Sequence, residues 1–142
     1  MTEEERFTVA LHYAYRAWRV ALDRGLRDLD ISQAGWVAVA YVAKATAPLS
    51  QSELAAQVGV EAATMVSTLD RLEKAGLVER VASETDRRVK HLRVTSAGQA
   101  IYDKVKARAD AVRAEIIGRL PPDKLLQATE LLEQLQTLIE NS

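Results

Sequence analysis

Apolar positions along the chain follow two different periods, and the change between them divides the sequence into elements. Over most of the chain, apolar side chains recur every three or four residues, the spacing of one buried helix face. Between residues 77 and 95 they alternate with polar side chains instead, which is typical of short strands. The pattern predicts helices over residues 4–22, 33–45, 51–58, 61–75 and 96–119, a last helix from Pro122, and a hairpin whose polar loop spans 83–88. The predicted fold class is mainly α with a small β-hairpin.

Local signals mark the ends of these predicted elements. Ser50 and Glu53 are spaced as a capping box, in which each side chain accepts a hydrogen bond from the other residue's backbone N–H. Gly59 and Gly76 follow predicted helices at the position where glycine tolerates the left-handed backbone that ends a helix. Thr95 is a suitable N-cap for the long helix after the hairpin. The predicted order is four helices, a hairpin and two helices.

The third and fourth predicted helices, joined at Gly59, have the pattern of a helix-turn-helix, in which the small Ala55 allows a close crossing. Four apolar residues of the second helix are expected to face inward: Met65, Val66, Leu69 and Leu72. Its other face carries small and hydroxyl side chains that can approach base edges in a major groove, together with one arginine. The predicted DNA-facing residues are Ala62, Ala63, Thr64, Ser67, Thr68 and Arg71, with Ser50 and Gln51 at the start of the first helix. The alternative is a helical hairpin whose outward face is only solvated.

A basic cluster follows this helix pair, although the chain as a whole has little net charge. The 19 Lys and Arg are balanced by 20 Asp and Glu, so the overall charge does not favour binding to nucleic acid. Arg87, Arg88, Lys90 and Arg93 nevertheless lie close together at the loop and second strand of the hairpin. A winged helix presents such a tip to the DNA backbone or minor groove, whereas the alternative is a solvated charge run. Asp86 would repel phosphate, so we expect it to orient a neighbouring arginine or to cap the loop.

The segment "LSQSELAAQVGVEAATMVSTLDRLEKAGLVERVASETDRRVKHLRVTSAG" resembles the MarR family of winged-helix transcription regulators. The motifs that carry the resemblance are "LEKAGLV", the "DRR" core of the loop and the following "LRVTSAG". It extends along the whole chain, and "YRAWRVALDRGLRDLDISQAGWVAV" and "RAEIIGRLPPDKLLQATELLEQL" are particularly similar to the SlyA-like branch. The resemblance implies a single domain over 1–142 that binds a pseudo-palindromic DNA operator as a homodimer, with residues 1–30 and 96–142 dimerising and 31–95 forming the DNA-binding lobe.

The resemblance also implies roles for the wing residues. Arg87 and Arg88 match the family's wing arginines, one at the groove and one supporting, and Asp86 matches their acidic partner. The sequence leaves open which arginine enters the minor groove and which one Asp86 holds. SlyA-like proteins often carry arginine where this chain has Ser67, so one guanidinium that could contact a base or a phosphate is absent.

The predicted first and last helices support the dimer on physical grounds. Both carry apolar stripes larger than a winged-helix core of about 70 residues can cover, since small domains have marginal cores. Packing against a second copy would bury those stripes. It would also place two recognition helices about one turn of DNA apart, ~34 Å.

Aromatic residues gather near the N-terminus, and both tryptophans fall between residues 13 and 41. The first interpretation is dimer core, because Trp and Tyr fill helical interfaces well. The second is a pocket for a small aromatic carboxylate, as in related regulators, formed by Arg16, Trp18, Trp36 and Tyr41. A ligand there would release DNA if it bound a second conformation more tightly.

Nothing in the sequence favours an enzyme. The chain has no cysteine, no glycine-rich phosphate loop, no "HExxH" and no nucleophile elbow, and its two histidines lack ligand-like neighbours, so we expect neither a metal nor a cofactor. Because no signal-like or membrane-spanning apolar run occurs, a cytoplasmic location without membrane contact is expected. The remaining alternative is a winged-helix protein-interaction module, which would need no basic tip. DNA affinity that falls steeply with salt would favour the regulator.

Overall fold

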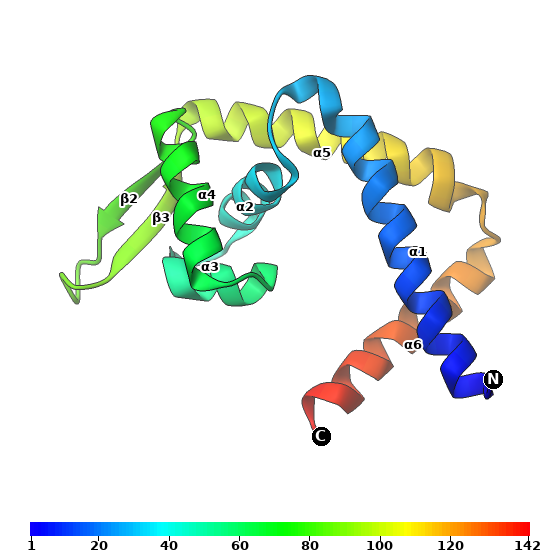
Figure 1. Cartoon of the computed structure of the whole chain (residues 1–142). Coiled ribbons are helices and arrows are strands. Elements are labelled where there is room, and N and C mark those ends of the chain that lie inside the picture. The colour runs from blue at the N-terminus through cyan, green and yellow to red at the C-terminus, as the bar shows by residue number, and fades with distance from the viewer.

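The computed structural model describes residues 1–142, and its fold is mainly helical with one small antiparallel sheet, as predicted (Figure 1). The elements in chain order are α1 (Glu3–Leu26), η1 (Arg27–Leu29), α2 (Gln33–Lys44), β1 (Leu49–Ser50), α3 (Gln51–Val58), α4 (Ala62–Lys74), β2 (Val78–Ala82), β3 (Lys90–Val94), α5 (Ser96–Ile116), η2 (Ile117–Arg119) and α6 (Pro122–Glu140). None of the helices combines the length and the apolar character needed to cross a membrane.

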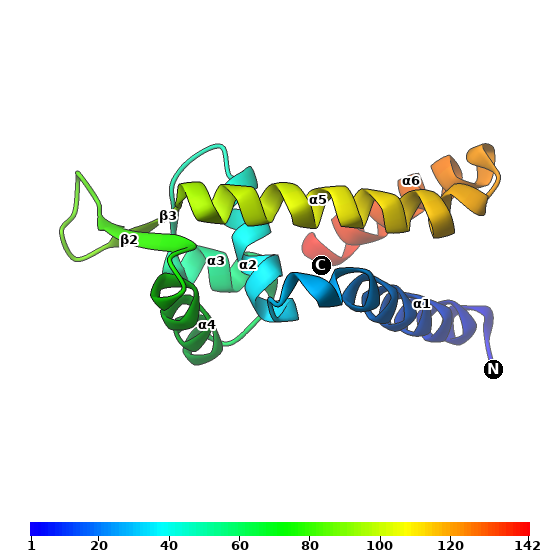
Figure 2. The same cartoon turned by 90° about the horizontal axis from the view of Figure 1, so that it is seen from above.

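Two regions can be followed in Figures 1 and 2. At one end, α2, α3, α4 and the sheet pack together around a common core. From that lobe α5 runs outward with α1 packed beside it, and α6 turns back from the far end of α5. The winged helix-turn-helix and the long helices are therefore spatially separate parts of one chain, joined through α5 and the turn between α1 and α2.

Helix α1 is longer than the sequence predicts, and the expected break after residue 22 is wrong. Leu22 and Leu26 continue the apolar stripe and are both buried. Gly25 lies where α1 crosses α5, since a Cβ there would come within 2.6 Å of Val112 Cγ2. The chain turns only at Asp30, whose φ of 54° lies in the left-handed region. Packing between distant helices sets this end, and the local pattern does not show it.

A third strand joins the predicted hairpin. β2 and β3 pair with Val78 opposite Val94, and β1 pairs with β3 with Leu49 opposite Leu92, which gives the order β1-β3-β2. Two residues carry too little pattern to predict a strand. Because β1 leads directly into α3, the sheet fixes the start of the helix-turn-helix relative to the wing.

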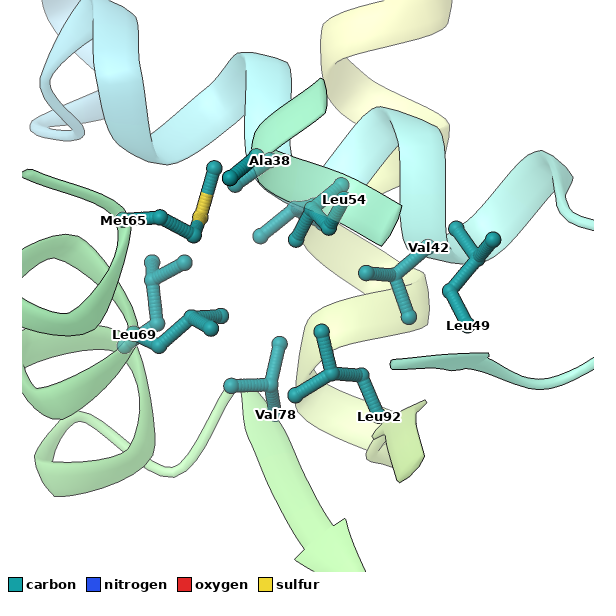
Figure 3. Packing of buried hydrophobic residues seen from close by; sticks show 11 residues of the cluster. Ala38, Val42, Leu49, Leu54, Met65, Leu69, Val78 and Leu92 are labelled. Carbon is teal, nitrogen blue, oxygen red and sulfur yellow. The ribbon is translucent and has the colours of Figure 1, made fainter. Parts of the chain in front are cut away.

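One apolar core holds the lobe together (Figure 3). Its buried residues are Ala38, Val39, Val42, Leu49, Leu54, Ala55, Met65, Leu69, Leu72, Val78 and Leu92. Burying a side chain such as Leu69 stabilises the fold by about 1.5–3 kcal/mol. Since Leu69 lies on α4 and Leu92 on β3, the second helix of the helix-turn-helix and the wing are anchored to the same apolar body.

The long C-terminal helices bury little within their own chain. In the predicted stripe of α5, Val105 and Ala109 are buried, Ile101 and Val112 are half-buried, and Ile116 is 43% exposed. α5 ends at Ile116, because the predicted last turn to residue 119 is the 3-10 turn η2. α6 has no buried residue and packs on no other element extensively.

Candidate nucleic-acid interface

The helix-turn-helix is formed by α3 and α4 as the sequence predicts. Ser50 Oγ accepts a hydrogen bond from the Glu53 N–H at 3.1 Å, and Glu53 Oε1 accepts one from the Ser50 N–H at 3.3 Å, which confirms the capping box. α3 ends at Gly59, whose φ of 81° favours glycine. Ala55 is buried in the core shared by α3 and α4. These features set α4 across α3 with one long face exposed.

The exposed face of α4 differs at two positions from the predicted one. Ala62, Ala63, Thr64, Ser67 and Arg71 are exposed, as expected of a surface that meets DNA. All five lie on the 13-residue helix α4, and their side chains are small, hydroxyl-bearing or cationic. This face can approach base edges and phosphates.

The corrections concern Val66 and Thr68. Thr68 is only 3% exposed, so the prediction that it faces outward is wrong. It follows Met65 by three residues and precedes Leu72 by four, which places it on the buried side of a helix with 3.6 residues per turn. Val66 directly follows Met65, which places it about 100° further round the helix, and it is 37% exposed. Its predicted inward position is therefore also wrong.

Gln51, predicted to face DNA, has its carbonyl oxygen engaged inside the protein. Gln51 Oε1 accepts a hydrogen bond from Arg80 Nε at 3.1 Å, and its amide nitrogen remains as a donor. Ser50, the neighbouring predicted contact, uses its hydroxyl in the capping box. Sequence reasoning missed Arg80, although the alternation along β2 places it on the same strand face as the buried Val78.

The tip of the wing is organised by two short polar side chains. Ser83 is buried, and its Oγ accepts hydrogen bonds from the Thr85 N–H at 3.2 Å and the Asp86 N–H at 3.4 Å. Asp86 Oδ1 accepts from the Arg88 N–H at 3.0 Å, which is an Asx-type turn. The loop is therefore held in shape by its own side chains.

Asp86 holds Arg88 and not Arg87. Arg88 Nε donates to Asp86 Oδ1 at 3.2 Å and Arg88 Nη2 to Oδ2 at 3.3 Å. The side-chain hydrogen bonds from Arg88, with the bond from its backbone N–H, lower the pKa of Asp86. Arg88 stays 91% exposed, and Arg87 and Lys90 are exposed too. Arg93 is set apart, because Glu79 pairs with it across the strands at 2.6 Å.

A cavity of about 520 Å³ lies between α1, α2, α4 and α5. Trp18, Trp36 and Tyr41 line it, as predicted for a ligand pocket, but Arg16 does not. Arg16 lines shallow depressions along α1 instead, because it lies two residues before Trp18, about 200° round the helix. Thr68 contributes to the cavity wall from α4.

The polar groups of the cavity are mostly donors. Trp36 Nε1 is buried and has no hydrogen-bond partner. On α5, Asp110 accepts from Lys106 Nζ at 2.7 Å and from Arg113 Nη1 at 2.9 Å, and the Lys106 hydrogen bond is the main cause of the lowered pKa of Asp110. Lys44 also lines the cavity, so its cations outnumber its carboxylates. This lining fits an anion with an apolar body.

Comparison with known proteins identifies the family. The MarR family model matches residues 42–90. The crystal structure of the transcriptional regulator PA3341 shares 34% sequence identity, with 96% of this chain and 99% of that chain covered and a TM-score of 0.89. The chain belongs to the MarR family. The predicted class, a winged-helix DNA-binding transcription regulator, is confirmed at the level of the MarR family.

Two more distant structures share the MarR-family fold. A mutant MarR from E. coli complexed with operator DNA has 23% identity and a TM-score of 0.81, with 92% of this chain and 93% of that chain covered. CouR from Rhodococcus jostii RHA1 bound to p-coumaroyl-CoA has 22% identity and a TM-score of 0.82, with 95% and 94% covered. The narrower prediction of a SlyA-like branch stays a prediction.

Proposed function

We propose that this MarR-family chain binds duplex DNA sequence-specifically, as a homodimer on a pseudo-palindromic operator, and regulates transcription there. The observation that carries the proposal is the exposed face of α4 lying on the same core as a wing whose tip presents Arg87, Arg88 and Lys90. In that arrangement α4 reads base edges in a major groove while the wing meets the backbone or an adjacent minor groove.

Each group on this surface has a proposed role. Ala62, Ala63, Thr64 and Ser67 face base edges, and Arg71 reaches a phosphate or a guanine. The proposed surface also includes Ser50 and Gln51 at the start of α3, and Asp86, Arg87, Arg88 and Lys90 in the wing. Gln51 contributes through its free amide donors and Asp86 through Arg88. Thr68 does not belong to the proposed DNA-contacting surface, because it is buried.

The homodimer rests on the apolar surface of the long helices. Large apolar side chains stay exposed on α1, on α6, at the end of α5 and directly after η2: Phe7, Leu11, Val20, Ile116, Leu120, Leu126, Leu131, Leu132, Leu138 and Ile139. Apolar patches of this extent are typical of protein interfaces. Residues 1–30 and 96–142 are accordingly proposed as the dimerisation region, and 31–95 as the DNA-binding lobe. Two-fold pairing then explains a pseudo-palindromic operator.

The proposal is tested by selecting bound sites from a pool of random duplex DNA. We expect enrichment of one pseudo-palindromic sequence whose half-sites are one helical turn apart. Affinity for it should fall steeply with salt, because phosphate contacts release counterions. Recovery of no common sequence, with salt-insensitive binding to a protein, would instead support the protein-interaction module.

A second function, release by a small aromatic carboxylate, is favoured by the aromatic and cationic lining of the cavity. The aromatic wall offers ring contacts, and Arg113, Lys106 and Lys44 offer charge. Thr64 and Thr68 of α4 line the same cavity, so a bound ligand would touch the helix that meets DNA. Repeating the DNA-binding measurement with an aromatic carboxylate, in the parent chain and in Trp36→Phe, tests this. Equal inhibition of both proteins would place the ligand elsewhere.

A further inference from the structure

Arg80 joins three elements of the lobe with one guanidinium. It lies at the centre of β2, and its side chain is only 17% exposed. Its Nη2 lies 2.8 Å from Asp70 Oδ1 and 3.4 Å from the Val66 carbonyl oxygen, both on α4. Its Nη1 lies 3.2 Å from Glu73 Oε1, and its Nε donates to Gln51 Oε1 at the start of α3. The Arg80 backbone N–H also donates to Glu73 Oε2.

This network differs from the other ion pairs of the lobe. The Arg93–Glu79 pair connects only β3 to β2, and the Asp86–Arg88 pair lies within one loop. Both arginines in those pairs are more than half exposed, and neither pair connects the wing to α4. Arg80 instead uses all three nitrogens of its guanidinium. Because this group is planar and rigid, its N–H directions fix where the partner oxygens must lie.

We propose that Arg80 is a positioning residue that fixes the angle between the wing and α4, so that both reach DNA together. This inference rests on the proposed function above. The apolar core alone anchors α4 and β2 at Leu69 and Val78, but apolar contacts are non-directional and permit rotation. Directional hydrogen bonds from Arg80 to Asp70 and Glu73 remove that freedom.

The proposal predicts that loss of the Arg80 network lowers affinity for the operator more than affinity for other DNA. Without the Arg80 network, α4 and the wing each keep their DNA-contacting side chains, but the two elements no longer fit one operator at the same time. Affinity for the operator should fall roughly tenfold, about the cost of one mismatched base pair, while affinity for random duplex stays within about twofold. The salt slope for random duplex should stay unchanged, because Arg80 itself contacts no phosphate.

The experiment compares Arg80→Met, which keeps most of the apolar stem, with Arg80→Lys, which keeps the charge. The matched control is Glu79→Gln, which breaks the exposed pair on the neighbouring residue of β2. Affinity for the selected operator and for a random duplex of equal length is measured over a range of salt. We expect Arg80→Lys to recover part of the specificity, and Glu79→Gln to bind like the parent chain.

A second measurement needs no DNA. Because the chain has no cysteine, spin labels can be placed at Lys74→Cys and Glu84→Cys, exposed positions on α4 and the wing loop. An excess of unlabelled chain keeps each distance within one subunit. We expect a narrow distance distribution in the parent and in Glu79→Gln, and a broader one in Arg80→Met.

The outcomes separate the alternatives. If Arg80→Met broadens the distance distribution and lowers affinity for the operator but not for random duplex, Arg80 positions the wing. A salt slope for random duplex that is reduced in Arg80→Met makes Arg80 a phosphate contact and overturns the proposal, as do unchanged distances. If Arg80→Met does not fold by circular dichroism, Asp70→Asn with Glu73→Gln removes the partners and is judged by the same results. A parent chain without operator preference contradicts the proposed function, while the distances still test Arg80.

Discussion

Replacing Arg88 with alanine is the most direct test of the wing. Residues 83–90 contain Arg87, Arg88 and Lys90 against Glu84 and Asp86, a formal charge of +1 that Arg88→Ala reduces to zero. The proposed dimer presents two wings, so every operator loses two guanidinium contacts. Asp86 engages Arg88 Nε and Nη2, which leaves Nη1 free to donate to DNA from an oriented side chain.

The magnitude follows from these two contacts. At about 1–3 kcal/mol for each, operator affinity should fall by roughly 2–6 kcal/mol per dimer. The slope of log affinity against log salt should flatten by about 0.9 per contact, or ~1.8 in all. Between 50 and 200 mM salt, the parent chain should therefore lose roughly tenfold more affinity than Arg88→Ala does.

The assay is fluorescence anisotropy of a labelled operator duplex at several salt concentrations. Arg87→Ala is the matched control, because Arg87 carries the same charge but has no partner that orients it. Ordering a free arginine side chain costs up to about 2 kcal/mol, so Arg87→Ala should cost less specific affinity than Arg88→Ala. Unchanged slopes in both variants would mean that the wing does not touch DNA, and a larger loss for Arg87→Ala would refute the role given to Asp86.

Four further predictions follow from the fold and the interface. A chain truncated before Pro121 should lose dimerisation and operator binding together, and a truncated monomer that still binds tightly in gel-shift assays would contradict the proposed dimer. Thr68→Val should change operator affinity by less than about twofold, since Thr68 is buried and lines the cavity; a tenfold loss would return Thr68 to the DNA surface. Ser67→Arg should steepen the salt slope by about 0.9 per subunit, and an unchanged slope would show that this position does not approach phosphate. Hydrogen bonds from Arg108 lower the pKa of Asp28, so the ionised Asp28 stabilises the fold above its unfolded pKa, and this stabilisation is lost as pH falls through the folded pKa. Asp28→Asn should therefore weaken the pH dependence of the melting temperature on the acid side. An unchanged pH profile would mean that the Asp28–Arg108 pair does not stabilise the fold.

Local chemistry made much of the lobe predictable from sequence. The capping box at Ser50, the glycine at Gly59 and the alternation around Leu92 each depend on neighbours within a few residues, and the structure has all three. The basic wing was predictable because charge clustering is visible along the chain. Asp86 was expected to hold an arginine, but only the loop geometry shows that it is Arg88.

What the sequence did not show depends on contacts between distant elements. The end of α1 is set by packing on α5. Thr68 is a polar residue that lies three positions after Met65 and four before Leu72, so helical spacing could have shown that it faces inward. Arg80 reads as one more charge in "VERVA", because its partners lie 7 to 29 residues away. Arg16 and Trp18 are neighbours in sequence but lie on different sides of α1.

Helix α6 has a thermodynamic consequence of its own. Most of the stability of a helix in a protein comes from packing of its apolar face, and α6 finds no extensive partner within its subunit. In the proposed homodimer, ordering α6 and binding a second copy are one linked equilibrium, so the melting temperature should rise with protein concentration. The number of chains in the cell would thus set the fraction that is fully folded as well as the fraction able to occupy DNA.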